Sequence, residues 1–407
     1  MESVTTASCK IEISDGSIAS PQGFISGGCN IGLREGRPDL GWIISKVPAA
    51  AAGVYTTNAF QAAPLNVTQS TIKKNHSLQA LLVNSVNANS CTGKQGIENA
   101  LQNQAWMAEK LDIPQALVGI ASTGVIGAQL PMPLFKAGIK SFNPSAPESS
   151  FEQAIMTTDT REKHLAVQVM IDGKTVTIGG ACKGSGMIHP NMATMLGFVT
   201  TDAAIEAASL QEALKEVTDK TFNRITVDGD TSTNDMVLAL ANGMAGNRAL
   251  TAAHPGWPDF LAALERVCQG LAKKIAADGE GATKLIEVRV SGAEDDQTAQ
   301  IISKSIVGSS LVKTAIFGTD ANWGRIICAI GYSGAAFNPD KVSLKLGEQM
   351  LFQDGMPIPF DEDRAKHYLE KDTIIIHALF GEGSGQAVAW GCDLTYNYVK
   401  INASYRS

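Results

Sequence analysis

Apolar and polar positions along the chain follow two different periods, which predicts strands and helices mixed together. Short apolar runs beside Gly, Asp or Asn are typical of strands. Such runs lie at residues 80–83, 117–121, 165–171, 175–178, 286–290, 301–306, 314–317 and 373–380. Apolar residues spaced three or four apart predict helices over 96–111, 209–222 and 260–275. Because the strands do not alternate strictly with helices, the pattern favours α/β or α+β layers over a (β/α)₈ barrel.

The predicted helix over 209–222 carries a start signal. Ser209 and Glu212 have the spacing of a capping box, in which each side chain bonds a backbone N–H at the helix start. We therefore expect the helix to begin at Ser209.

Composition narrows the class of protein. Apolar residues make up 44% of the 407 residues, enough for a large core. The net charge is −7 and no basic run occurs, which argues against nucleic acid as a partner. No run of 18 apolar residues occurs, and the N-terminus has no signal-peptide pattern, so we expect no membrane contact. The seven cysteines are widely spaced without a C-x-x-C pair, which indicates reduced thiols and a cytoplasmic protein.

The segment 183–202, KGSGMIHPNMATMLGFVTTD, carries the candidate chemistry. Thr194 stands before an apolar run, 195–199, that predicts a buried strand. A threonine hydroxyl needs a base to act as a nucleophile at neutral pH. If Thr194 became a chain terminus, its own α-amine, with a reference pKa of about 7.7–8.0, would be such a base. The six histidines form no spaced pair that would indicate a triad or a metal site.

The same hydroxyl can create that terminus. It would attack the carbonyl of Ala193, shift the peptide to an ester, and leave water to release the ester. Ala193 is small and leaves room for the attack. The alternative is a Gly-rich loop that simply enters a core strand, and the residues alone leave both interpretations open.

The segment resembles the signature of the ornithine acetyltransferase family, the bifunctional glutamate N-acetyltransferase and amino-acid acetyltransferase of arginine biosynthesis. The family pattern is Lys-Gly-x-x-Met-x-x-Pro-x-Met-Ala-Thr-Met-Leu, which this chain matches from Lys183 to Leu196. Further blocks follow in the family's order at residues 49–64, 84–93, 121–127, 155–160, 228–235, 281–288, 318–326 and 390–402. The resemblance thus covers nearly the whole chain.

The resemblance implies a fold and a processing step. The fold would be an α+β, layered αββα sandwich, similar to N-terminal-nucleophile hydrolases but with a different topology. Cleavage between Ala193 and Thr194 would give an α chain, 1–193, and a β chain, 194–407, that begins with the nucleophile. Two chains of each kind would form a heterotetramer.

The resemblance also implies site residues. Thr123 and Gly124 would form the oxyanion hole, where a hydroxyl and a backbone N–H stabilise developing negative charge. Substrate contacts would fall on Lys183, Glu280, Asn402 and Ser407, and on one threonine of the block 157–160, with Thr158 and Thr160 both candidates. Lys183 suits a substrate carboxylate, and Glu280 suits an ammonium group.

The implied reaction is a ping-pong acetyl transfer. Thr194 would take acetyl from N-acetylornithine and pass it to glutamate, with no metal or organic cofactor. The sequence does not decide whether acetyl-CoA is a second donor.

The chain departs from the family pattern at five positions, namely Val86, Ser90, Glu162, His189 and Ala321. Val86 stands where the family has Gly. A β-branched residue disfavours positive φ, so we expect a negative φ and a changed turn there.

Two other functions remain open from sequence. Aminopeptidases with a self-cleaving fold would use water in place of glutamate as the acceptor. A nucleotide-binding protein would use the glycines of 381–385 after the predicted strand 373–380, although their spacing is not G-x-G-x-x-G.

Overall fold

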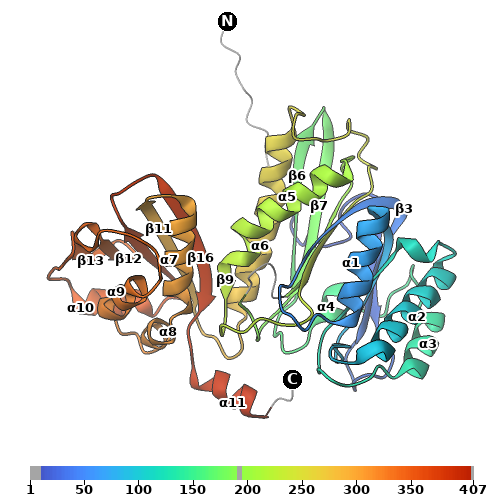
Figure 1. Cartoon of the computed structure of the whole chain (residues 1–407), viewed down its shortest axis with the longest axis horizontal. Coiled ribbons are helices and arrows are strands. Elements are labelled where there is room, and N and C mark those ends of the chain that lie inside the picture. The colour runs from blue at the N-terminus through green and yellow to red at the C-terminus, as the bar shows by residue number, and fades with distance from the viewer. Residues whose placement is uncertain (1–10, 190–194, 405–407) are drawn as a thin grey trace, which may run out of the picture.

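The structure is a computed structural model that describes residues 11–189 and 195–404. Its strands form two sheets, each packed against helices, in two lobes (Figure 1). We call them the large lobe and the small lobe, after their sheets. This arrangement confirms the predicted α+β class of layered sheets and helices.

The large sheet has the strand order β1-β6-β7-β8-β10-β3-β4-β5, and β2 pairs with β3. Its strands are β1 (Ile11–Glu12), β2 (Phe24–Cys29), β3 (Leu40–Tyr55), β4 (Ser77–Asn84), β5 (Val118–Ser122), β6 (Lys163–Ile171), β7 (Lys174–Lys183), β8 (Leu196–Thr201) and β10 (Met236–Ala241). Strand β8 runs antiparallel to β7 and parallel to β10. Every residue of β8 and β10 is buried, as expected for central strands covered on both faces.

The small sheet has the order β14-β13-β12-β15-β11-β16-β9. Its strands are β9 (Ile225–Thr226), β11 (Leu285–Ala293), β12 (Ser343–Leu346), β13 (Gln349–Gln353), β14 (Met356–Pro357), β15 (Thr373–Leu379) and β16 (Gly385–Cys392). The glycines at 381–385 therefore lead from β15 into another strand. A phosphate site at a helix start, as the nucleotide-binding alternative requires, is not formed there.

Helices cover both sheets. They are α1 (Ala63–Asn75), α2 (Gly93–Leu111), α3 (Met132–Ser141), α4 (Phe151–Ile155), α5 (Ala207–Lys220), α6 (Trp257–Ala277), α7 (Asp296–Gly308), α8 (Ser310–Phe317), α9 (Trp323–Gly331), α10 (Glu362–Leu369) and α11 (Tyr396–Ser404), with short 3₁₀ turns at Gln115–Leu117, Phe222–Arg224 and Pro339–Lys341. Helix α6 contacts β6 and β7 of the large sheet and also β16 of the small sheet, so it joins the lobes. None of the helices in the described residues combines the length and apolarity needed to cross a membrane.

The segments 1–193 and 194–407 do not coincide with the two lobes. Strands β8 and β10, from the second segment, pair with β7 and β3 of the first segment inside the large sheet. A break in the chain before β8 would therefore leave both pieces held in one sheet by backbone hydrogen bonds.

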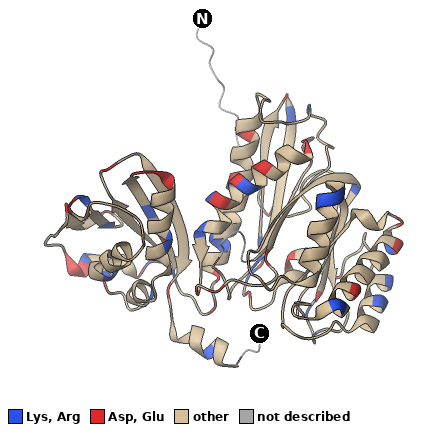
Figure 2. Ribbon diagram, in the orientation of Figure 1, with Lys and Arg blue, Asp and Glu red and all other residues tan. Residues whose placement is uncertain are grey.

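Charged residues of both signs are spread over the helices and strands of both lobes. Figure 2 shows Lys and Arg interspersed with Asp and Glu, including along α5 and α10. Helices α1 and α3 carry lysines without acidic residues, but only two lysines each.

Three local predictions are wrong. Residues 301–306 and 314–317 lie in helices α7 and α8, because the buried positions of α7 (Ala299, Ile302, Ser303, Ile306 and Val307) follow a helical period that the apolar run obscured. Helix α5 begins at Ala207, and its N-cap, Glu206, makes no side-chain cap bond. Ser209 lies inside the first turn, so the capping box does not form.

Candidate active site

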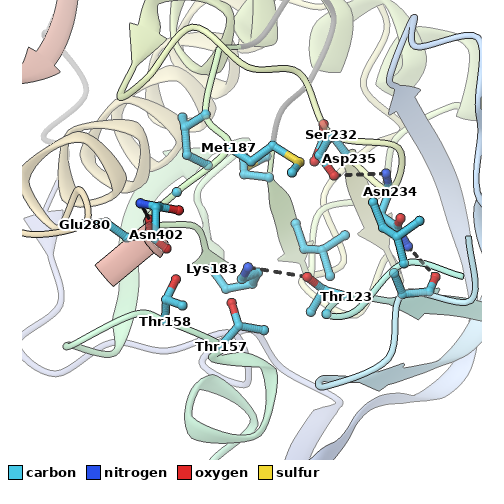
Figure 3. A pocket seen from close by; sticks show the side chains of 17 residues that line it. Thr123, Thr157, Thr158, Lys183, Met187, Ser232, Asn234, Asp235, Glu280 and Asn402 are labelled. Carbon is cyan, nitrogen blue, oxygen red and sulfur yellow. Dashed lines mark hydrogen bonds between the residues drawn. The ribbon is translucent and has the colours of Figure 1, made fainter. Parts of the chain in front are cut away.

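A pocket lies where the ends of β5 and β7, the start of β8 and helix α11 meet. It is lined by Ala88, Thr123, Gly124, Ile126, Thr157, Thr158, Lys183, Gly186, Met187, Ile188, Met195, Leu196, Ser232, Asn234, Asp235, Glu280 and Asn402. Figure 3 shows the labelled side chains arranged around one hollow. Six residues predicted from sequence are therefore brought together: Thr123, Gly124, Thr158, Lys183, Glu280 and Asn402.

The turn after β5 forms one wall of the pocket. The Thr123 amide donates to the carbonyl of Asn84, the last residue of β4, at 3.0 Å. Gly124 has φ of +130°, and a Cβ there would lie 2.0 Å from the carbonyl carbon of Val86. Only glycine fits this position, which keeps the backbone of 123–124 close to the pocket.

Val86 holds that turn in a strained conformation. Its φ is +88°, so the predicted negative φ is wrong. Its carbonyl accepts from the Val125 amide at 2.8 Å while its backbone lies against Gly124. These contacts keep the turn in a glycine-like shape, at a strain of about 1–3 kcal/mol for a residue outside its favoured region.

Lys183 ends β7 and points into the pocket (Figure 3). Its ammonium donates to the Thr123 hydroxyl at 3.4 Å, and the side chain is buried. Burial lowers the pKa of Lys183, although Asp159, Asp235 and Glu280 oppose that shift. An ammonium held in this way is a docking group for a carboxylate of a small ligand.

Glu280 and Asn402 form the opposite wall. The Asn402 side-chain amide donates to a Glu280 carboxylate oxygen at 2.8 Å, which ties α11 to the segment after α6. A Cβ on Gly186 would lie 2.4 Å from the Glu280 carboxyl group, so glycine allows this close contact. The carboxylate remains an acceptor for a ligand ammonium group.

The block 157–160 contributes two threonines, one of which was a candidate. Thr157 and Thr158 both line the pocket. Thr160 is exposed, does not line it, and binds Asp278 through both its amide and its hydroxyl. The other predicted residues, Ala193, Thr194 and Ser407, lie outside the described residues.

Sequence reasoning missed Asp235, which also lines the pocket. The side chain is buried, and within the described residues its Oδ2 atom has no hydrogen-bond partner. Burial raises the pKa of Asp235 well above its ordinary value, and Ser232 and Lys183 offset only part of that effect. A carboxylate directly before the buried run 236–241 was the signal that could have marked it.

The segment leading to residue 190 is fixed by Asp228. Its carboxylate accepts from the amides of Met187 and Ile188 at 2.7 and 2.8 Å, and from the Tyr398 hydroxyl at 3.1 Å. The Val227 amide adds a bond to the Ile188 carbonyl at 2.7 Å. The chain therefore approaches the pocket along a path set by residues 227–228.

A threonine hydroxyl and a glycine at the end of one strand lie beside a buried lysine and buried carboxylates, an arrangement suited to an enzyme that transfers acyl groups on a small charged compound. The comparison with known proteins agrees. The chain matches the ArgJ family over residues 26–407 and belongs to that family.

Its relatives match along almost their full length. The chain is 58% identical over 398 residues to the arginine biosynthesis bifunctional protein ArgJ of Bacillus licheniformis, with 98% of each chain covered. It is 56% identical over 393 residues to the protein of the same name from Bacillus subtilis, with 96% and 97% covered. A crystal structure of ArgJ from Bacillus halodurans has 56% identity and a TM-score of 0.51, and covers 52% of this chain and 100% of that chain. Family membership confirms the resemblance and removes the aminopeptidase alternative.

Proposed function

We propose that the chain cuts itself between Ala193 and Thr194, and that Thr194 then carries acetyl from N-acetylornithine to glutamate. The observation that carries the proposal is the convergence of Thr123, Gly124 and Lys183 beside the first residues of β8. Met195, which follows Thr194 in the sequence, lines the pocket. The activity follows from membership of an acetyltransferase family of arginine biosynthesis.

The first half-reaction begins when the Thr194 hydroxyl attacks the acetyl carbonyl and gives its proton to the Thr194 amine. The hydroxyl of Thr123 and the amide of Gly124 would donate to the resulting oxyanion. The C–N bond breaks, and the amine returns its proton to the departing ornithine. The acetyl group is then an ester on Thr194.

The second half-reaction reverses these steps with glutamate. Its amine attacks the acetyl ester, the tetrahedral oxyanion collapses, and N-acetylglutamate leaves as the threonine hydroxyl is restored. Lys183 would pair with a substrate carboxylate, and Glu280 with the side-chain ammonium of ornithine. Thr158 and Asn402 would add hydrogen bonds, and we retain Ser407 as a proposed contact.

Two observations support cleavage. Strand β8 is paired on both sides within the large sheet, so a cut before it leaves the fold held together. The solved chain from Bacillus halodurans is matched over its whole length yet covers only 52% of this chain. The proposed β chain, 194–407, is 214 of 407 residues, or 53%.

The relatives' description as bifunctional supports a second donor, which we propose to be acetyl-CoA. We also propose an assembly of two α and two β chains in the cytoplasm. Native mass spectrometry would test the assembly, and a single αβ pair would overturn it.

Intact mass under denaturing conditions tests the central claim. Active enzyme should give two fragments that meet at 193/194, while Thr194→Ala should give one full-length species without acetyl transfer. Thr123→Ser serves as a matched control, since it retains a hydroxyl beside the pocket and should still be cut. Full activity from an uncut chain would refute the proposal.

A further inference from the structure

Three charged side chains beneath the pocket form a buried group that the proposed reaction does not use. The Lys163 ammonium lies 2.6 Å from an Asp159 oxygen and 2.5 Å from an Asp278 oxygen. All three side chains are almost fully buried. We call this group the Lys163 triad.

Each aspartate carboxylate of the triad also binds the backbone of the 157–160 block, and for Asp278 this bond comes from the Thr160 amide at 3.0 Å. Asp159 accepts from the amides of Thr157 and Gly184, at 3.0 and 2.7 Å. The backbone carbonyl of Asp278 accepts from the Ser185 hydroxyl at 2.6 Å. The triad therefore joins the 157–160 block to the turn that follows Lys183.

The third pocket segment is linked to the same turn. The Glu280 amide donates to the Ser185 carbonyl at 2.9 Å. A shift in the triad would thus move the threonine block, the lysine turn and the glutamate together. These are the groups that face the ligand.

The charges around Asp159 indicate a more specific role for the triad. Burial alone raises the pKa of Asp159, but Lys183 and Lys163 outweigh it and lower that pKa to about 2. Asp159 is therefore an anion between two lysines, and Lys163 is the one in direct contact. Removing one partner of a buried ion pair leaves an uncompensated charge. Without Lys163, Lys183 would be the remaining lysine whose charge acts on Asp159.

We propose that Lys163 is a positioning residue: by binding Asp159 and Asp278, it keeps Asp159 from capturing Lys183 and so leaves the Lys183 ammonium available to the substrate carboxylate. This inference rests on the proposed function, because it assigns the Lys183 ammonium to a substrate.

The decisive experiment compares Lys163→Met with the double variant Asp159→Asn/Lys163→Met. In the single variant, Asp159 would bind Lys183, so the KM for glutamate and the Kd for N-acetylglutamate, measured by calorimetry, should rise about 10-fold or more, equivalent to about 1.4 kcal/mol. The kcat should change far less. In the double variant the competing carboxylate is gone, and both constants should return most of the way to the wild-type values.

A matched control removes a buried carboxylate elsewhere. Glu287 lies in β11 of the small sheet, outside the pocket, and binds Lys273 of α6, Arg289 and the Trp390 indole. Glu287→Gln should lower the melting temperature without changing KM or Kd. This separates loss of a buried charge from loss of positioning.

Two results would overturn the inference. The first is a folded Lys163→Met variant whose Kd for N-acetylglutamate is unchanged. The second is a double variant that binds as weakly as the single one, because this would indicate local collapse of the pocket. If Lys163→Met does not fold, the single variant Asp159→Asn tests the inference. It removes the carboxylate that competes for Lys183, while Lys163 keeps its ion pair with Asp278. Affinity equal to or tighter than wild type supports the inference, and weaker affinity contradicts it. Absence of acetyl transfer in the wild-type enzyme would instead count against the proposed function.

Discussion

The pocket side of the large lobe and the core of the small lobe use burial in opposite ways. Around the pocket, Lys183, Asp235 and Glu280 are buried side chains that carry ionisable groups. In the small lobe, by contrast, β11, β15 and α7 meet through apolar residues such as Val288, Ile302 and Ile376, which are fully buried. One region buries charge at a free-energy cost, while the other gains stability from apolar contacts.

This difference assigns chemistry to the pocket and stability to the apolar core of the small lobe. A charge held in a buried pocket interacts more strongly with an opposite charge on a ligand than it would in bulk water. The strained Val86 adds a further cost beside the oxyanion turn. We therefore expect pocket variants to change catalysis, and small-lobe variants to change stability.

The largest effect is expected at the oxyanion turn. Thr123→Ala removes a hydroxyl donor, so kcat on the cleaved enzyme should fall about 100- to 1,000-fold, or about 3–4 kcal/mol. Steady-state acetyl transfer from N-acetylornithine measures it, with Thr123→Ser as the control that restores a hydroxyl. A kcat within threefold of wild type for Thr123→Ala would remove Thr123 from the oxyanion site.

The small lobe should show the opposite response. Ile302→Ala leaves a cavity between α7 and the small sheet and should lower stability by about 3 kcal/mol. Urea unfolding in the uncut Thr194→Ala background would measure the loss on a single chain. In cleaved enzyme at 25 °C, the same substitution should leave kcat/KM nearly unchanged. A large fall in kcat/KM would show that the two regions are coupled.

Sequence patterns predicted the large lobe better than the small one, for a physical reason. In the large sheet, strands such as β5 and β6 are short apolar runs, and the sequence pattern predicted them. In α7, polar and apolar residues mix within IISKSI, so a short window cannot separate a strand from a helix. Only the wider spacing, from Ala299 to Val307, carries the helical period.

The sequence predicted those site residues that belong to a family motif. It did not predict the contacts between residues that only the fold brings together. Lys183, Glu280 and Asn402 are far apart in sequence, and their meeting depends on α11 returning to the end of α6. The carboxylate of Asp235 before a buried run was a local signal, but its place at the pocket depends on the pairing of β10 with β8, which a local pattern does not reveal. Thr160 looked equivalent to Thr158, yet its side chain turns to Asp278.

A smaller effect is expected from relief of strain. Val86→Gly should stabilise the large lobe by about 1 kcal/mol, because relief of the positive-φ strain exceeds the entropy that glycine loses on folding. Urea midpoints in the Thr194→Ala background would measure it. Val83→Gly is the contrasting control, since Val83 lies in β4 and is fully buried, and its loss should destabilise. Equal destabilisation by both variants would show that Val86 is not strained.

The smallest effect is a pH dependence of carboxylate binding. Burial lowers the pKa of Lys183, and the groups that face it are Asp159, Lys163, Asp235 and Glu280. A lysine is charged below its pKa, so its attraction for a carboxylate is lost as pH rises, starting below the ordinary lysine value of about 10.4. The Kd of N-acetylglutamate should therefore rise more than about twofold between pH 7 and 10.

N-acetylglutamate is the right ligand for this measurement because its carboxylates stay ionised and it has no free amine to titrate. Lys183→Arg is the matched control, since a guanidinium keeps its charge over the whole range. Its Kd should be flat with pH, even if binding is weaker at pH 7. If the wild type and Lys183→Arg follow the same pH curve, the dependence arises from another group. Lys183 would then not be the cation that binds the carboxylate, and the buried charge of the pocket would serve structure alone, as apolar packing does in the small lobe.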